Sequence, residues 1–111
     1  MSVLSWLGVH LTNRGKALSL YKRGMTRARK RDHQGAINDY TASIKVHDLP
    51  TDVKAMVLYN RALVYMAAGD DLKGVDDLDT VVAMNEAPVN VKTMARQKLA
   101  KMESRTGKSK V

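Results

Sequence analysis

Cysteine is absent from this chain of 111 residues, phenylalanine is absent as well, and tryptophan occurs once. Without cysteine the chain has no disulfide, no thiolate metal ligand and no cysteine nucleophile. We therefore expect a reducing, cytoplasmic location. The apolar residues are mostly Ala, Val, Leu and Met, which favour helices over strands.

A long hydrophobic run is also absent. The apolar stretch "MSVLSWLGVHL" is shorter than the ~20 residues that a membrane-spanning helix needs, and it lacks the features of a signal peptide. Its periodicity places four apolar residues on one helical face: Val3, Leu4, Leu7 and Leu11. We expect this segment to pack on the domain as a short helix. The alternative is a membrane or partner anchor formed by residues 1–11, with Trp6 at the interface.

Acidic residues are absent from one third of the chain. Residues 1–31 hold eight Lys and Arg residues and no acid, residues 32–90 hold four against ten acids, and residues 91–111 hold seven against one. The net charge of +8 therefore comes from two basic ends around an acidic middle. Such a pattern indicates nucleic-acid binding less strongly than a uniformly basic chain would.

Signatures of catalysis and metal binding are absent too. The chain has no glycine-rich phosphate loop and no nucleophile elbow. His10, His33 and His47 lack the spacing of metal ligands, and "DDLKGVDDLD" lacks the glycine and final glutamate of a calcium loop. We expect no enzyme activity, no bound metal and no cofactor.

An internal repeat is present at a shift of 38, which aligns "PTDVKAMVLYNRALVY" with "PVNVKTMARQKLAKME". The same shift matches four further pairs: Tyr21 with Tyr59, Arg23 with Arg61, Asp32 with Asp70, and Asp39 with Asp77. Each unit is therefore predicted to contain the same structural elements.

Helix signals divide each unit into two antiparallel helices joined by a short turn. The predicted helices cover residues 13–30, 33–46, 53–68, 71–84 and 91–103. Pro50 and Pro88 separate the units, and the expected N-caps are Asp32, Asp52, Asp70 and Asn90. This gives an all-α fold with a short N-terminal segment over residues 1–12, a helical domain over residues 13–104 and a disordered basic tail over residues 105–111.

The stretches "LYKRGMTRARKRDHQGAINDYTASI" and "LYNRALVYMAAGDDLKGVDDLDTVV" resemble tetratricopeptide (TPR) repeats. The family pattern of bulky, small and aromatic residues falls on Leu20, Gly24, Arg27, Ala36, Tyr40 and Ser43, and on Leu58, Ala62, Tyr65, Gly74, Leu78 and Val81. Three features depart from the pattern: Arg27 replaces an aromatic residue, Gly74 replaces alanine, and the period is 38 rather than about 34. The alternative is a helical bundle without TPR geometry.

The resemblance implies an α-α superhelix whose first helices line a concave, peptide-binding surface. The positions that it assigns to this surface are Tyr21, Lys22, Arg29, Tyr59, Asn60 and Lys98. Lys and Asn donors suit carboxylate oxygens, so we expect an acidic or C-terminal peptide. Lys22 stands where the full family clamp has asparagine, so that clamp is not implied.

The last helix is expected to cap the stack, with Met94, Leu99 and Met102 facing inward. Association into a homodimer would be favoured by the basic ends, the acidic middle and the apolar N-terminal segment. The competing function is electrostatic nucleic-acid binding by the basic N-terminal helix, through Arg14, Lys16, Arg23, Arg27, Arg29, Lys30 and Arg31. The basic run "RGMTRARKR" has no aromatic residue for base stacking.

Overall fold

The computed structural model describes residues 12–106, which form five α-helices and contain no strand. These are α2 (Asn13–Arg29), α3 (His33–Ile44), α4 (Thr51–Ala67), α5 (Asp71–Ala83) and α6 (Val89–Thr106). The all-α, repeat-like fold class predicted from the sequence is confirmed. The apolar stretch of residues 1–11 and most of the predicted tail lie outside the described residues.

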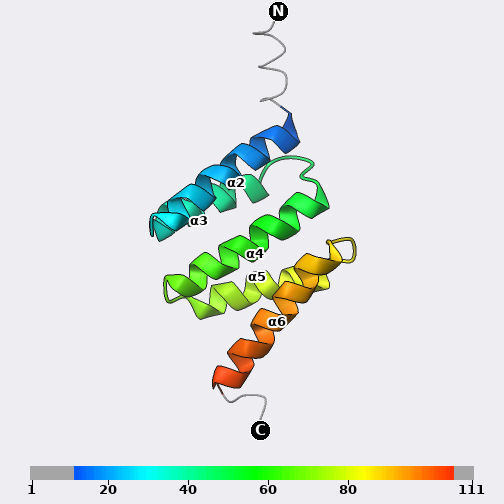
Figure 1. Cartoon of the computed structure of the whole chain (residues 1–111). Helices are drawn as coiled ribbons and strands as arrows, with labels where there is room; N and C mark the ends of the chain where they lie inside the picture. Colours follow the sequence, from blue (N-terminus) through cyan, green and yellow to red (C-terminus); the bar gives the residue numbers. More distant parts are fainter. Residues whose placement is uncertain (1–11, 107–111) are drawn as a thin grey trace, which may run out of the picture.

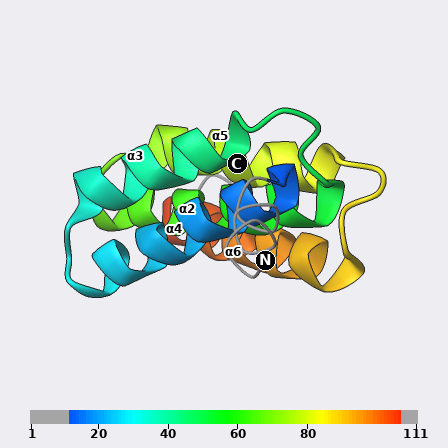
Figure 2. The same cartoon turned by 90° about the horizontal axis from the view of Figure 1, so that it is seen from above.

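The helices stack as two hairpins followed by a single helix (Figure 1). We call α2 with α3 unit one, and α4 with α5 unit two. The first helices are neighbours in the order α2, α4, α6, while α3 and α5 lie along the other side of the stack (Figure 2). None of these five helices has the length and apolarity needed to span a bilayer.

The turn inside each unit is built in the same way. Arg31 has φ of 64°, and its equivalent in unit two, Gly69, has φ of 90°. The next residue then caps the second helix: Asp32 accepts a hydrogen bond from the Gly35 amide at 3.0 Å, and Asp70 accepts one from the Lys73 amide at 3.2 Å. These two predicted N-caps are confirmed.

The other two predicted caps are wrong, because α4 and α6 begin earlier than expected. Pro50 stands at the N-cap of α4 in an extended conformation, and Asp52 lies in the first helical turn. There the guanidinium of Arg14 and the backbone amide of Val53 hold the pKa of Asp52 below its usual value. Asn90 similarly lies inside α6, one residue after the start of that helix.

The two units are each held together by an arginine–aspartate pair at equivalent positions. Arg23 donates to Asp39 at 3.0 and 2.8 Å, and Arg61 donates to Asp77 at 2.8 and 2.7 Å. Both carboxylates are buried. The repeat alignment had matched all four residues but had not predicted that they pair.

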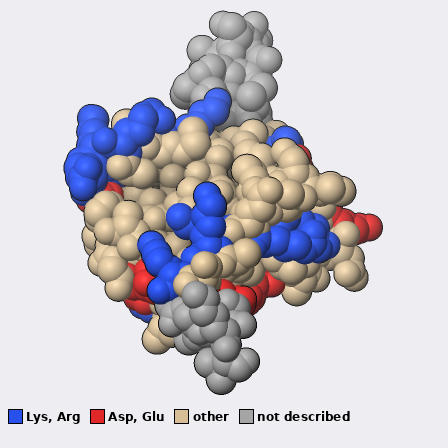
Figure 3. Space-filling view, turned by 60° about the horizontal axis from the view of Figure 1, so that its bottom comes forward, with Lys and Arg blue, Asp and Glu red and all other residues tan. Residues whose placement is uncertain are grey.

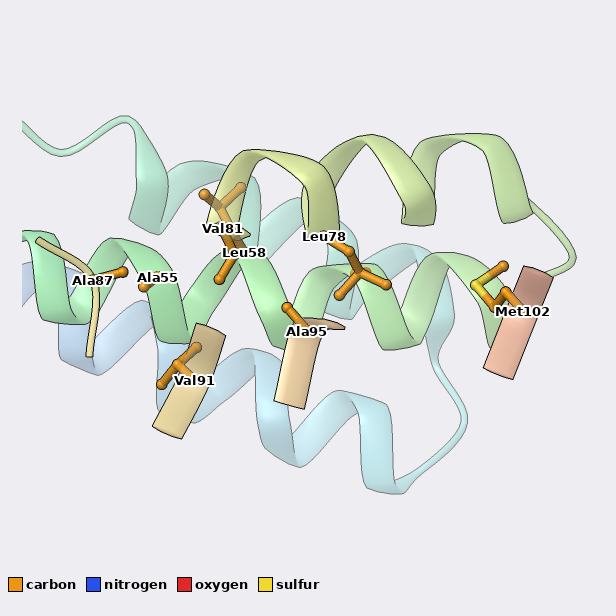
Figure 4. Close-up of a cluster of buried hydrophobic side chains, with 9 residues drawn as sticks. Ala55, Leu58, Leu78, Val81, Ala87, Val91, Ala95 and Met102 are labelled. Atoms are coloured by element: carbon orange, nitrogen blue, oxygen red, sulfur yellow. The ribbon is translucent and has the colours of Figure 1, made fainter. Parts of the chain in front are cut away.

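Two apolar clusters form the core. In the first, Val53, Val57 and Val64 of α4 pack against unit one. In the second, the residues one repeat period later, Val91, Ala95 and Met102 of α6, pack against unit two (Figure 4). Burying a valine or methionine side chain contributes roughly 1.5–3 kcal/mol. The same three positions therefore attach each first helix to the unit before it.

The helix α6 ends the stack with its other face in water, since Thr93, Arg96 and Ala100 are exposed. Of the residues expected to face inward, Met102 is buried and Leu99 is half-buried, but Met94 is 39% exposed. The prediction for Met94 is wrong because the inward face of α6 runs through Val91 and Ala95 instead. The helix continues to Thr106, two residues beyond the expected end of the helical domain.

Candidate functional site

The six residues predicted to bind a peptide all lie on first helices. Tyr21, Lys22 and Arg29 are on α2, Tyr59 and Asn60 are on α4, and Lys98 is on α6. Because α4 packs against both α2 and α6, the structure brings these helices together as one surface, which we call the first-helix surface. How each side chain is held differs from residue to residue.

Tyr21 and Asn60 are in direct contact across α2 and α4. The amide nitrogen of Asn60 donates to the Tyr21 hydroxyl at 3.0 Å and to the Met56 carbonyl at 2.9 Å, which engages both of its hydrogens. The Tyr21 hydroxyl accepts this bond, and its own proton remains available for donation. Burial raises the pKa of Tyr21, so that proton is retained at neutral pH. Tyr21, rather than Asn60, is therefore the donor that this pair can offer to a ligand.

Lys98 lines an open hollow between α4 and α6 with a volume of about 720 Å³. The lining also includes Arg105 of the same helix, and Leu63 and Ala67 of α4. One carboxylate, that of Asp71 at the start of α5, also contributes to the lining. The lining thus combines two cations with apolar side chains of α4, a composition that suits a ligand carrying both a carboxylate and an apolar side chain.

The remaining three predicted residues contribute in different ways. Lys22 is exposed, and Arg29 donates to the hydroxyl of Thr26 at 3.2 Å on its own helix. Tyr59 is half-buried and packs against the second apolar cluster. Within residues 12–106, no hydrogen bond or ion pair joins the side chain of Lys22 or Arg29 to the other four residues. Both belong to the Lys- and Arg-rich sequence of α2. Figure 3 shows Lys and Arg side chains gathered on the side of the molecule where α2 ends in Figure 1.

An apolar row on the first helices was missed by the sequence analysis. Leu18, Met56 and Met94 are each separated by one repeat period and occupy the same position of α2, α4 and α6. Leu18 and Met56 are half-buried, and Met94 is exposed. The repeat period was the signal that could have found this row. Leu18 and Met56 also pack against the two apolar clusters, whereas Met94 on the last described helix is 39% exposed.

Side chains able to bind metal do not cluster in the described part of the chain. Within residues 12–106, no group of three or more His, Asp or Glu side chains is placed to hold a metal ion. The aspartates of "DDLKGVDDLD" are divided between a helix cap, an ion pair and the surface of α5.

No protein-family model, no curated protein sequence and no solved structure matches this chain. The geometry of its own residues is therefore the basis for a function.

Proposed function

We propose that this protein is a non-enzymatic, TPR-like interaction module that binds an acidic peptide segment along the first-helix surface. The observation that carries the proposal is the hollow between α4 and α6, where Lys98 and Arg105 flank apolar side chains of α4. Cationic donors beside apolar side chains favour a ligand that carries both carboxylates and apolar side chains.

The chemistry of the surface suggests how such a ligand binds. Its carboxylates meet Lys98 and Arg105 at one end, and Lys22 and Arg29 at the other. The Tyr21 hydroxyl, held by Asn60 at 3.0 Å, donates between them. Apolar side chains of the ligand contact the row formed by Leu18, Met56 and Met94. A C-terminal carboxylate is one form of this ligand, and an internal acidic segment is another.

The test compares charge reversal on the first-helix surface with charge reversal elsewhere. Fluorescence polarisation measures binding of a panel of acidic peptides, each with a free or an amidated C-terminus. We expect Lys22→Glu with Lys98→Glu to weaken binding at least tenfold. The control, Lys45→Glu with Lys73→Glu, makes the same change in net charge at exposed positions outside the first helices. Unchanged binding by the first double variant, or an equal loss in the control, would refute the proposal.

Nucleic-acid binding is the second candidate, favoured by the exposed cations at the C-terminal end of α2: Lys22, Arg23, Arg29, Lys30 and Arg31. Part of this charge is already compensated, because Arg23 and Arg27 both approach Asp39, at 2.8 and 3.6 Å. Binding to generic RNA should therefore vanish between low and moderate salt. Affinity that survives moderate salt would favour the nucleic-acid candidate over the peptide module.

Membrane attachment by residues 1–11 remains the third prediction, and it lies outside the described residues. Co-sedimentation with anionic liposomes tests it. The full chain is compared with the variant Leu4→Glu with Leu7→Glu, and an attachment through this segment requires that the variant stay in solution.

A further inference from the structure

An apolar crevice opens between α5 and α6, at the opposite end of the stack from α2, and we call it the terminal crevice. It has a volume of about 250 Å³, and its lining includes Leu72, Leu99 and Met102. Three carboxylates also line it: those of Asp71, Asp79 and Glu103. Leu72 is 79% exposed, so an apolar side chain of a ligand can reach it.

The equivalent place between unit one and unit two is filled. There, Arg61 donates to the Thr41 hydroxyl at 3.0 Å and to Asp77, and its guanidinium lies 5.4 Å from the ring centre of Tyr65. Arg61 thus links α3, α4 and α5. The guanidinium of Arg61 therefore helps to fill the space between the two units.

The terminal crevice has the complementary composition. One repeat period after Arg61 stands Leu99 of α6, and one period after Thr41 stands Asp79 of α5. Leucine cannot donate a hydrogen bond, and Asp79 has no ion pair among residues 12–106. The terminal crevice is therefore open, with an apolar and acidic lining. The equivalent place between unit one and unit two is instead filled by Arg61.

We propose that the terminal crevice binds the N-terminal segment, residues 1–11, of a second copy of this protein. The segment carries Val3, Leu4, Leu7 and Leu11 at the spacing of one helical face. No acidic residue occurs before Asp32, and eight Lys and Arg residues do. Its apolar face matches Leu72, Leu99 and Met102, and the basic sequence that follows matches the acidic lining of the crevice.

The segment of the same copy is too far away to serve. Residue 12 directly precedes α2, the first helix of the stack (Figure 1). The terminal crevice, in contrast, is lined by residues near the end of α6. Two helix spacings of about 8–10 Å each separate α2 from α6, and about three helical turns separate the start of α2 from the level of Met102. The four apolar residues share a face only in a helix, and a helix of this length spans only about 16 Å. The occupant therefore comes from another copy.

Association of this kind joins the N-terminal segment of one copy to the terminal crevice of the next. The two surfaces are different, so the contact is heterologous and can be repeated from copy to copy. The crevice shares one lining residue, Asp71, with the hollow that Lys98 lines, and it includes none of the six residues predicted to bind a peptide. The inference does not depend on the proposed peptide binding.

Sedimentation velocity over a range of protein concentrations tests the inference. We expect the full-length chain to associate, and Leu72→Glu to weaken that association at least tenfold, because it places a charge among the carboxylates of the crevice. The control is Val89→Glu, which alters a side chain of the same 79% exposure outside the crevice and should associate as the original chain does. Circular dichroism verifies that each variant is folded.

A mixing experiment then identifies the two surfaces. Leu4→Glu with Leu7→Glu removes the apolar face of the segment, and Leu72→Glu removes the crevice, so each variant alone should be monomeric. Their mixture retains one intact segment and one intact crevice, and should form a 1:1 dimer that grows no further. A full-length chain that stays monomeric, a segment variant that still associates, or a mixture that stays monomeric would each overturn the inference.

Discussion

Unit one and unit two contain the same arginine–aspartate pair, yet the two pairs have different surroundings. The Arg61 side chain is 17% exposed, because Thr41 of the preceding unit and the ring of Tyr65 cover it. The Arg23 side chain is 59% exposed, and Arg27 stands where unit two has Tyr65. A repeated contact therefore changes its role with its place in the stack: inside the stack it joins two units, and at the end it joins only two helices.

Removing the carboxylate of each pair should give the largest difference between the units. Asp77→Ala leaves Arg61 largely buried without its partner, and we expect a loss of about 3 kcal/mol in the free energy of unfolding. Asp39→Ala leaves Arg23 in contact with water, so its loss should be clearly smaller. Urea denaturation of both variants measures the two losses. Equal losses would show that burial of the arginine does not distinguish the pairs.

The close approach of the two helices also differs between the units. A Cβ atom at Gly24 would lie 2.6 Å from the ring of Tyr40, which is buried, so we expect Gly24→Ala to cost about 2 kcal/mol. A Cβ atom at Gly74 would meet the flexible side chain of Met66 at 2.7 Å and, less closely, the backbone oxygen of Ala62 at 3.1 Å. The gain in helix propensity should offset that contact and keep Gly74→Ala within about 1 kcal/mol of the original chain. Thermal unfolding ranks the two variants, and the opposite order would contradict this account.

Opposite substitutions at the equivalent turn positions of the two units should have smaller effects on stability. Gly69 adopts φ of 90° in unit two, where Arg31 adopts φ of 64° in unit one. Gly69→Ala should lose about 1 kcal/mol, because a side chain disfavours this conformation. Arg31→Gly should gain up to about 1 kcal/mol for the same reason, with part of the gain cancelled by the flexibility of glycine in the unfolded chain. Denaturation midpoints that moved in the same direction for both variants would contradict the prediction.

Lowering the pH should have the smallest effect on stability, and it should act through Asp39 of unit one. Hydrogen bonding from Arg23 holds the pKa of Asp39 below its usual value, against the opposing effect of burial. The stabilisation by this carboxylate is therefore complete above the unfolded-state pKa of about 3.9 and is lost as the pH falls through the lower, folded-state pKa. In denaturation curves from pH 7 to pH 2, the difference between the original chain and Asp39→Asn should shrink at the acid end. A constant difference would show that Asp39 does not titrate with the fold.

The sequence was sufficient to predict the repeat, the helices and the inner turns. Asp32 and Asp70 could be identified as caps because capping depends on contacts within three residues. The positions of Asp52 and Asn90 were misjudged because helix starts after Pro50 and Pro88 were placed too late. The pairing of Arg23 with Asp39 could not be predicted from spacing alone, since it depends on how two helices lie against each other.

The candidate site was predictable at the level of helix faces and less so at the level of hydrogen bonds. The place of Lys98 on α6 follows from the repeat, and its side chain lines a hollow with residues of α4. The predicted donor role of Asn60 remains untested, but both of its amide hydrogens already have acceptors on neighbouring residues. That arrangement depends on the side chain of Tyr21 from the other unit.

The three positions that attach each first helix to the unit before it also make the length of this protein adjustable. Val53, Val57 and Val64 attach α4 to unit one, and Val91, Ala95 and Met102 attach α6 to unit two. A duplicated copy of residues 50–87, inserted after residue 87, would present to its neighbours the contacts that they already make. Gene duplication or a designer could thus lengthen the molecule by whole units, and each inserted unit would widen the first-helix surface by one more helix.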